Sequence, residues 1–307
     1  MASLLPTCKK ALDTFISSPT SAFTVFRTIA GPAPSAAAAC RARTLFILDS
    51  SFNPPQVAHL TLATTALASR DLARYPRPHR LLLLFASHNA DKQPAPAAFE
   101  HRLAMMTLFA EDMAARIAET RPGYVAGGDG AAEKMWQPVP IDVGVTSRPY
   151  YNDKTAAIEA TGTYASSGPG PKHVHLVGYD TFVRIFTARY YAAEHEPPFS
   201  ALDDFMARHG LRITLRAGED YGDEAAQRGF LERLRRGEME EDGGRREWAE
   251  RIEMVDEDEE AVDVSSTDVR KAVQRRDWKV VDKLCTARVA RWIREKGLYS
   301  ESESKIS

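Results

Sequence analysis

Short runs of apolar residues alternate with helical patterns along most of this chain. The runs TLFIL (44–48) and RLLLLF (80–85) have the length of strands and lack polar alternation, which predicts strands buried on both faces. Each run is followed by a segment with helical spacing, over 57–73 and 99–119. Strands that alternate with helices in this way are typical of a mostly parallel sheet.

The alternation continues through the last third of the chain. Further strands are predicted at 141–146, 173–178, 211–217 and 251–255. Further helices are predicted near 152–160, from about 180, around the charged segment ERLRRGEMEE (232–241), near 267–275 and near 285–296. We therefore predict an α/β protein with a Rossmann-like, mostly parallel sheet, helices on both faces, and ligands at the carboxyl ends of the strands. This domain is expected over 44–299. Residues 1–43, which end in an Ala/Pro-rich stretch, are expected to be a partly disordered N-terminal lead-in, and 300–307 a flexible tail.

Composition and charge narrow the classes of partner. Lys and Arg number 40 against 42 Asp and Glu, a formal net charge of -2, so no basic field predicts binding to nucleic acid or to an anionic membrane. No apolar run approaches the roughly 20 residues that span a bilayer. The three cysteines are far apart and match neither a disulfide framework nor a metal-ligand spacing. We expect a soluble protein of the cytoplasm, the nucleus or both, with reduced thiols.

The loop after the first predicted strand has the composition of a phosphate site. In a parallel sheet, such a loop brings backbone N–H groups and a helix N-terminus together. Ser50, Ser51 and Asn53 add short hydrogen-bonding side chains, and His59 lies in the first turn of the next helix. Taken alone, the segment is more typical of an ordinary turn beside a structural histidine. The chain has neither the Walker pattern nor the dinucleotide-binding glycine pattern.

A second polar segment, DVSSTDVRKAV (263–273), begins a helix near the C-terminus. Ser265, Ser266 and Thr267 precede the helical pattern, and Arg270 lies just inside it. Hydroxyls, free backbone N–H groups and a forked guanidinium together suit a polyphosphate. Plain helix capping explains this segment equally well when it is considered by itself.

Together, the two segments resemble the signature motifs of nucleotidyltransferases that include the nicotinamide mononucleotide adenylyltransferases. LDSSFNPPQVAHL is similar to G-S-F-N-P-x-[HT]-x-x-H-L, and SSTDVR is similar to S-[ST]-T-x-x-R, in the same order along the chain. Three positions depart from the first motif: Ser50 replaces Gly, Gln56 replaces His or Thr, and Ala58 replaces Gly. Over residues 44–296 the arrangement is most similar to fungal members of the filamentation-promoter type.

The resemblance implies a nucleotidyltransferase fold and a site for Mg²⁺-bound ATP, with no protein side chain assigned to the metal. Because Gln56 can donate a hydrogen bond but carries no positive charge, it predicts a slower reaction than the family's histidine would allow. Two of the implied residues, His59 and Arg270, would be catalytic. The implied ATP-binding residues are Ser51, Phe52, Asn53, Gln56, His59, Ser266, Thr267 and Arg270.

The resemblance also assigns residues to an acceptor side. Lys92 would bind the acceptor phosphate, and Arg102 would orient the substrate or brace the loop. Gly178 allows close backbone approach, and Asp180 could accept a hydrogen bond from a ribose or from a nicotinamide amide. The plain alternatives are solvation for Lys92, a salt bridge for Arg102 and helix capping for Asp180. Further candidates, with packing as their alternative role, are Tyr150, Tyr151 and Thr155.

The activity that the resemblance implies is transfer of AMP from ATP to nicotinamide mononucleotide, which gives NAD and pyrophosphate. The acceptor phosphate would attack the α-phosphorus in line, so positioning and charge stabilisation take the place of a covalent intermediate. Other acceptors such as phosphopantetheine, or cytidylyl transfer, are alternatives within the class. A nucleotide-binding regulatory protein and an ATP hydrolase are the alternatives from other classes.

Overall fold

The computed structural model describes residues 3–18, 21–29, 42–68, 70–87, 97–119, 139–165, 170–216, 221–256 and 264–300. One seven-stranded sheet has the order β1-β4-β3-β2-β5-β6-β7. β1 runs antiparallel to β4, and every other neighbouring pair is parallel. The prediction of an α/β fold with a mostly parallel sheet is confirmed. The strands are β1 (Phe23–Ile29), β2 (Thr44–Asp49), β3 (His79–Ala86), β4 (Ile141–Thr146), β5 (Lys172–Gly178), β6 (Gly210–Thr214) and β7 (Ile252–Val255).

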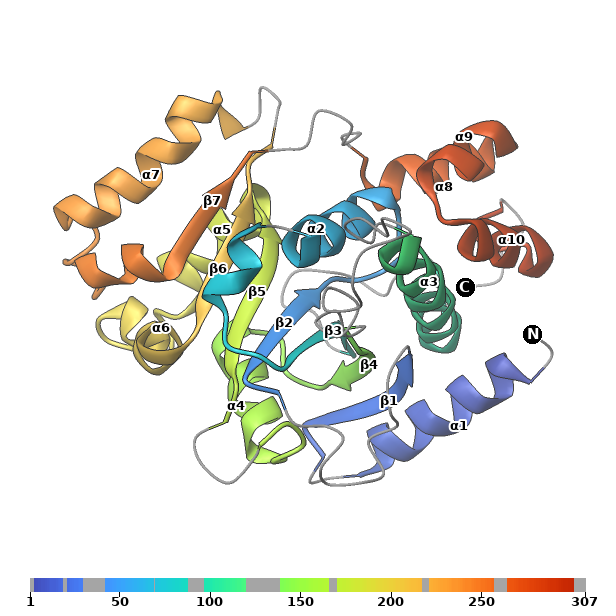
Figure 1. The fold of residues 1–307 in the computed structure, drawn as a ribbon, viewed down its shortest axis with the longest axis horizontal. Coiled ribbons are helices and arrows are strands. Elements are labelled where there is room, and N and C mark those ends of the chain that lie inside the picture. Colours follow the sequence, from blue (N-terminus) through green and yellow to red (C-terminus); the bar gives the residue numbers. More distant parts are fainter. Residues whose placement is uncertain are drawn as a thin grey trace, which may run out of the picture.

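Helices cover both faces of the sheet. Successive side chains of a strand point to opposite sides, and because the apolar side chains of the central strands are buried on both sides, each face needs a layer of helices. On β2, Phe46 and Leu48 pack into an apolar cluster with α3, whereas Leu45 and Ile47 pack into another cluster with α4. Figure 1 shows α7 beside β7 and α8 to α10 grouped on the opposite side of the molecule. The α-helices are α1 (Leu4–Ser17), α2 (Val57–Ala68), α3 (Phe99–Glu119), α4 (Tyr151–Ala160), α5 (Tyr179–Ile185), α6 (Asp203–Arg208), α7 (Glu224–Arg236), α8 (Ser266–Gln274), α9 (Trp278–Leu284) and α10 (Ala287–Lys296).

The strand order reverses at the boundary between β2 and β5. From β2 the chain builds outward through β3 and β4, and it then returns to place β5 on the other side of β2. In open parallel sheets, the loops at such a reversal diverge and leave a crevice at the carboxyl ends of the strands. Asp49 ends β2 and Gly178 ends β5, so both predicted loops open onto this crevice.

The folded domain begins before the predicted boundary at residue 44. α1 packs against α3, with Cys8 and Phe15 buried in the larger apolar cluster. β1 extends the sheet by pairing with β4. The pattern of β1 was easily missed, because it is an edge strand in which only Phe23 is buried. The Ala/Pro-rich stretch and the tail after residue 300 lie outside the described residues.

Most other predicted elements agree with the structure, and α3 and β4 have the predicted bounds. The sequence pattern predicted neither α6, a helix of six residues, nor α9, a helix of seven residues between two predicted ones. Among the described residues, no helix combines the length and the apolar character needed to cross a membrane. Cys8 and Cys285 are free thiols, and Cys40 lies outside the described residues.

Candidate nucleotide-binding site

Two adjoining cavities lie at the carboxyl ends of β2 and β5. The larger measures about 290 Å³ and extends along the loop after β2 to the start of α8. The smaller measures about 250 Å³ and extends beneath α4 and α5. The walls that the two cavities share are formed by Asp49, Ser50, Ser51, Asp180 and Thr181. A ligand with two parts could therefore occupy both cavities at once.

The start of α8 lies across the loop after β2 and closes one side of the larger cavity. Ser266 Oγ donates to the Pro54 carbonyl at 2.9 Å, and the Arg270 guanidinium donates to the Asn53 carbonyl at 2.7 Å. A second nitrogen of Arg270 donates to the Thr267 hydroxyl at 2.8 Å. The structure thus brings together the two motifs that the sequence placed about two hundred residues apart, and all three α8 residues line the larger cavity.

A capping box fixes the N-terminus of α8. Ser265 Oγ accepts from the Asp268 N–H at 3.2 Å, and Asp268 Oδ2 accepts from the Ser265 N–H at 3.0 Å. These reciprocal bonds satisfy backbone groups that a helix end leaves open, and they set the direction of the first turn. The bonds to Ser265 also hold the pKa of Asp268 below its ordinary value.

His59 faces the larger cavity from the first turn of α2. Its Nδ1 accepts from the Gln56 N–H at 3.1 Å, and its Nε2 lies 2.8 Å from Ser50 Oγ. Because Nδ1 is an acceptor, the proton of the neutral ring resides on Nε2 and points toward Ser50. Burial lowers the pKa of His59 to about 4. The imidazole is therefore neutral at pH 7 in the free protein and offers one N–H at the cavity wall.

Gln56 is engaged with the backbone at both ends of its side-chain amide. The amide oxygen accepts from the Ala58 N–H, and the amide nitrogen donates to the Val264 carbonyl at 2.9 Å. The side chain is 5% exposed, although it lines part of the larger cavity. In this arrangement Gln56 fastens the loop to the segment before α8, a role that the sequence analysis did not predict.

The side chains of Phe52 and Asn53 point into the protein interior, whereas the motif resemblance implied that these residues bind ATP. Phe52 is fully buried, with its ring centroid 5.0 Å from that of His59, and its backbone has a φ of 45°, which a non-glycine residue rarely adopts. The Asn53 amide oxygen accepts from the Tyr299 hydroxyl at 2.7 Å. Neither side chain lines the larger or the smaller cavity. Both shape the loop from behind.

Arg102 braces the same loop from α3. Two nitrogens of its guanidinium donate to the Ser51 carbonyl, at 2.8 and 2.5 Å, and the group lies over the Phe85 ring at 4.3 Å. The residue is 1% exposed, and burial lowers its pKa to about 10. Since Arg102 lines neither cavity, the structure favours the bracing role over contact with an acceptor.

On the expected acceptor side, Gly178 ends β5 and Asp180 lies in the first turn of α5. A Cβ at Gly178 would lie 2.8 Å from the Asp180 carboxylate, so a side chain there would displace the carboxylate. Asp180 lies 3.6 Å from the Arg216 guanidinium and lines both cavities. Lys92 lies outside the described residues.

Two residues of the smaller cavity, Asp49 and Lys154, carried no signal in the sequence, whereas Tyr150 and Tyr151 in the same wall were candidates. Asp49 and Lys154 form a buried ion pair, with side chains 7% and 6% exposed. Burial, together with the nearby negative charges of Asp49 and Asp180, raises the pKa of Tyr151 well above its ordinary value. The ring centroids of Tyr150 and Tyr191 are 6.0 Å apart in the same wall. No short motif links Asp49 to Lys154, because tertiary folding alone brings them together.

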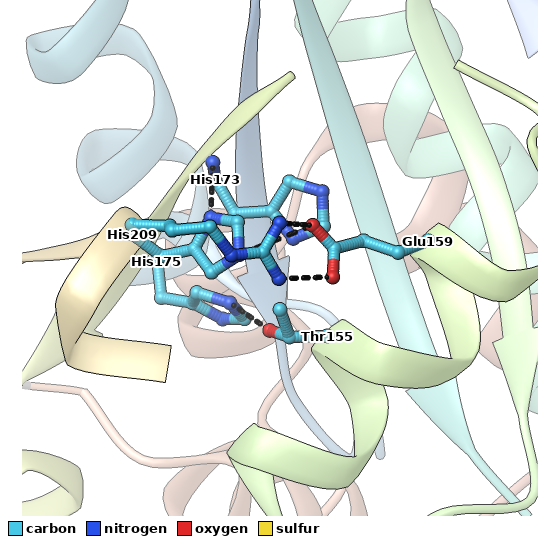
Figure 2. Close-up of polar contacts among 6 residues, drawn as sticks. Thr155, Glu159, His173, His175 and His209 are labelled. Carbon is cyan, nitrogen blue, oxygen red and sulfur yellow. Dashed lines mark hydrogen bonds and ion pairs between the residues drawn. The ribbon is translucent and has the colours of Figure 1, made fainter. Parts of the chain in front are cut away.

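Three buried histidines lie against the inner face of α4, as Figure 2 shows. His175 Nε2 is 3.1 Å from the Thr155 hydroxyl, and His209 Nε2 is 3.3 Å from the Glu159 carboxylate. The rings of His173 and His209 stack with centroids 4.5 Å apart. Thr155 therefore serves packing and hydrogen bonding behind the smaller cavity, which it does not line.

The structure is thus an α/β protein with two joined cavities at the reversal point of its sheet. No family model matches the chain. A curated relative from Schizosaccharomyces pombe, described as "Putative nicotinamide mononucleotide adenylyltransferase", is 30% identical over 148 residues, which cover 48% of this chain and 44% of the relative. The match thus spans less than half of the relative's length. It confirms the resemblance that the motifs indicated.

A solved structure also resembles this chain. The nicotinic acid mononucleotide adenylyltransferase of Plasmodium falciparum, complexed with NaAD, matches with 14% identity and a TM-score of 0.45, covering 84% of this chain and 97% of that one.

Proposed function

We propose that this chain is an adenylyltransferase that transfers AMP from ATP to nicotinamide mononucleotide. The observation that carries the proposal is the meeting of two nucleotidyltransferase-like motifs, on the loop after β2 and at the start of α8, around a single cavity. That cavity adjoins a second one of similar volume through the shared wall at Asp49 and Asp180. The arrangement suits two substrates that react where the cavities meet.

In this proposal the larger cavity holds ATP. The N-terminus of α8, the hydroxyls of Ser266 and Thr267 and the guanidinium of Arg270 would bind the β- and γ-phosphates. His59 would turn its Nε2–H from Ser50 Oγ to the α-phosphoryl oxygens, where negative charge grows during the reaction. In this proposal Mg²⁺ would arrive bound to ATP and would offset part of the charge on its phosphates.

The smaller cavity would hold the acceptor. Its tyrosines offer faces for an aromatic base, and the Asp180 carboxylate could accept from the carboxamide of nicotinamide. A phosphate oxygen of the mononucleotide attacks the α-phosphorus, a new P–O bond forms, and the bond to pyrophosphate breaks. The reaction needs no covalent intermediate on the protein, so orientation and charge stabilisation account for catalysis.

A nucleotide-binding regulatory protein is a second candidate. The observation that favours it is the engagement of the Gln56 amide with the Val264 carbonyl, because the family's His or Thr at this position would contact phosphate. A chain that binds ATP tightly but releases no pyrophosphate would fit this candidate.

The test is incubation of the purified chain with ATP, Mg²⁺ and a panel of acceptors that contains nicotinamide mononucleotide, nicotinic acid mononucleotide and phosphopantetheine. Pyrophosphate release and the product mass are measured. We expect NAD as the main product, and a loss of about 100-fold or more in kcat for His59→Ala and Arg270→Ala. Arg275→Ala, an exposed arginine one turn further along the chain, is the matched control. Unchanged turnover in both site variants would refute the assignment of these residues.

A further inference from the structure

The ion pair between Asp49 and Lys154 lies where the two cavities meet. Asp49 ends β2 and lines both cavities, and Lys154 reaches it from α4 and lines the smaller one. Burying two charges costs desolvation energy, and their attraction often does no more than offset that cost. Stability alone is therefore a weak reason for such a pair, and its position in a cavity wall indicates a role toward a ligand.

Among the described residues, Lys154 is the basic residue that both lines the smaller cavity and is buried. Arg184, the other basic residue lining that cavity, is exposed. In the larger cavity, Arg270 donates to Asn53 and Thr267, and Arg216 faces Asp180. An ammonium group has three donors and can turn between acceptors without moving the backbone. Lys154 can thus exchange Asp49 for another anion in the cavity.

The helix that carries Lys154 is held firmly from behind. Thr155 contacts His175, and Glu159 contacts His209 on the inner face of α4 (Figure 2). Glu159 also accepts two bonds from the Arg208 guanidinium, at 2.7 and 2.6 Å. A charged group is most useful to a ligand when the surrounding contacts fix its position before the ligand binds.

We propose that Lys154 binds the phosphate of the acceptor, a role that the family resemblance gave to Lys92, and that Asp49 holds the Lys154 ammonium group in place until that phosphate enters. The proposal rests on the proposed function and names the acceptor class as a phosphomonoester of a nucleoside. The phosphate is then positioned at the wall that both cavities share, next to ATP.

The first experiment compares steady-state kinetics of Lys154→Met with those of the unmodified chain. We expect the KM for the mononucleotide to rise about 10- to 100-fold, as for the loss of a hydrogen bond between charged groups, and the KM for ATP to stay within about twofold. Lys172→Met is the matched control, because Lys172 begins β5 at the far end of the sheet and lines neither cavity. An unchanged acceptor KM in Lys154→Met would overturn the proposal.

The second experiment uses ribose 5-phosphate as a probe and measures its Kd by calorimetry, so that it does not depend on turnover. We expect weaker binding for Lys154→Met and tighter binding for Asp49→Asn, which removes the competing anion. The double variant Asp49→Asn/Lys154→Met leaves no unpaired buried charge, so it should fold and still bind weakly. Equal Kd values in the folded variants, or no binding to the unmodified chain, would refute the proposal.

The two experiments separate this proposal from the proposed function. Absence of any dinucleotide product from the unmodified chain counts against adenylyl transfer, and the ribose 5-phosphate measurement then still decides whether Lys154 binds phosphate. If Lys154→Met instead forms NAD normally with an unchanged acceptor KM, the proposed adenylyl transfer is supported and the proposed role of Lys154 is refuted.

Discussion

Gln56 shows how a residue at a motif position can serve a structural purpose. The sequence suggested an amide that donates to phosphate, whereas the structure shows an amide that joins Ala58 to Val264. The side chain therefore fixes the distance between the loop after β2 and the start of α8. Any effect of Gln56 on catalysis would pass through the shape of the larger cavity.

A change of Gln56 to Glu tests this structural role. Glutamate has nearly the same shape but cannot donate to the Val264 carbonyl at pH 7, so the free energy of unfolding should fall by about 1–3 kcal/mol. Urea denaturation measures this change. Gln274→Glu, at an exposed position at the end of α8, should change the free energy by less than about 0.5 kcal/mol. Equal stability of the two variants would contradict the proposal that Gln56 holds the loop after β2 against the segment before α8.

Other residues of the site show the limits of prediction from sequence. His59, Ser266 and Arg270 line the larger cavity as expected, because short motifs at strand and helix ends fix the direction of their own side chains. Phe52 and Asn53 belong to the same motif, yet the left-handed backbone at Phe52 turns both toward the core. Contacts such as the bond from Tyr299 to Asn53 arise from distant parts of the chain, and a local pattern carries no sign of them.

At the scale of elements, the strands were the most predictable part of the molecule. β2, β3 and β4 are buried on both faces, so their apolar runs are visible without any alternation. β1 lies at the edge and is only partly buried, and its pattern therefore resembled a loop. The sequence pattern also placed α1 outside the domain, because the apolar face of a single helix does not show that α3 is its partner.

Removal of residues 1–29 tests whether α1 and β1 belong to the folded domain. The truncation would expose the surfaces that Cys8, Leu12, Phe15 and Phe23 cover, at a cost of about 2 kcal/mol for each large apolar side chain. Because domains are stable by only about 5–15 kcal/mol, we expect aggregation or a large fall in Tm. Size-exclusion chromatography and thermal unfolding measure these effects. A truncated chain that is monomeric with an unchanged Tm would restore the lead-in interpretation.

At the scale of the whole molecule, buried histidines make stability depend on pH. Burial lowers the pKa of His173 and His209 to about 3, and that of His59 to about 4, from an ordinary value of 6.5. The unfolded chain therefore binds protons first as the pH falls. The stability that these neutral rings contribute is complete above pH 6.5 and is lost progressively between pH 6.5 and about pH 3 to 4.

We expect the free energy of unfolding to fall by about 2 kcal/mol per histidine between pH 8 and pH 5. The positive charges of Arg208 and Arg251 add to the lowering of the pKa of His209, and the negative charge of Glu159 partly opposes the lowering of the pKa of His173. His173→Leu is an informative variant, since neither ring nitrogen of His173 has a hydrogen-bond partner among the described residues. It should keep its stability at pH 8 and lose less at pH 5. Parallel pH profiles for the variant and the unmodified chain would contradict this account.

The central claim is that the two cavities together carry AMP from ATP to a mononucleotide phosphate. The most direct measurement uses ATP labelled at the α-phosphate, with Mg²⁺ and nicotinamide mononucleotide, and follows the label through chromatography of the products. Adenylyl transfer predicts that the label enters NAD, with one pyrophosphate released for each NAD formed. Label that remains in ATP, or that appears in AMP or ADP without any dinucleotide, would contradict the claim.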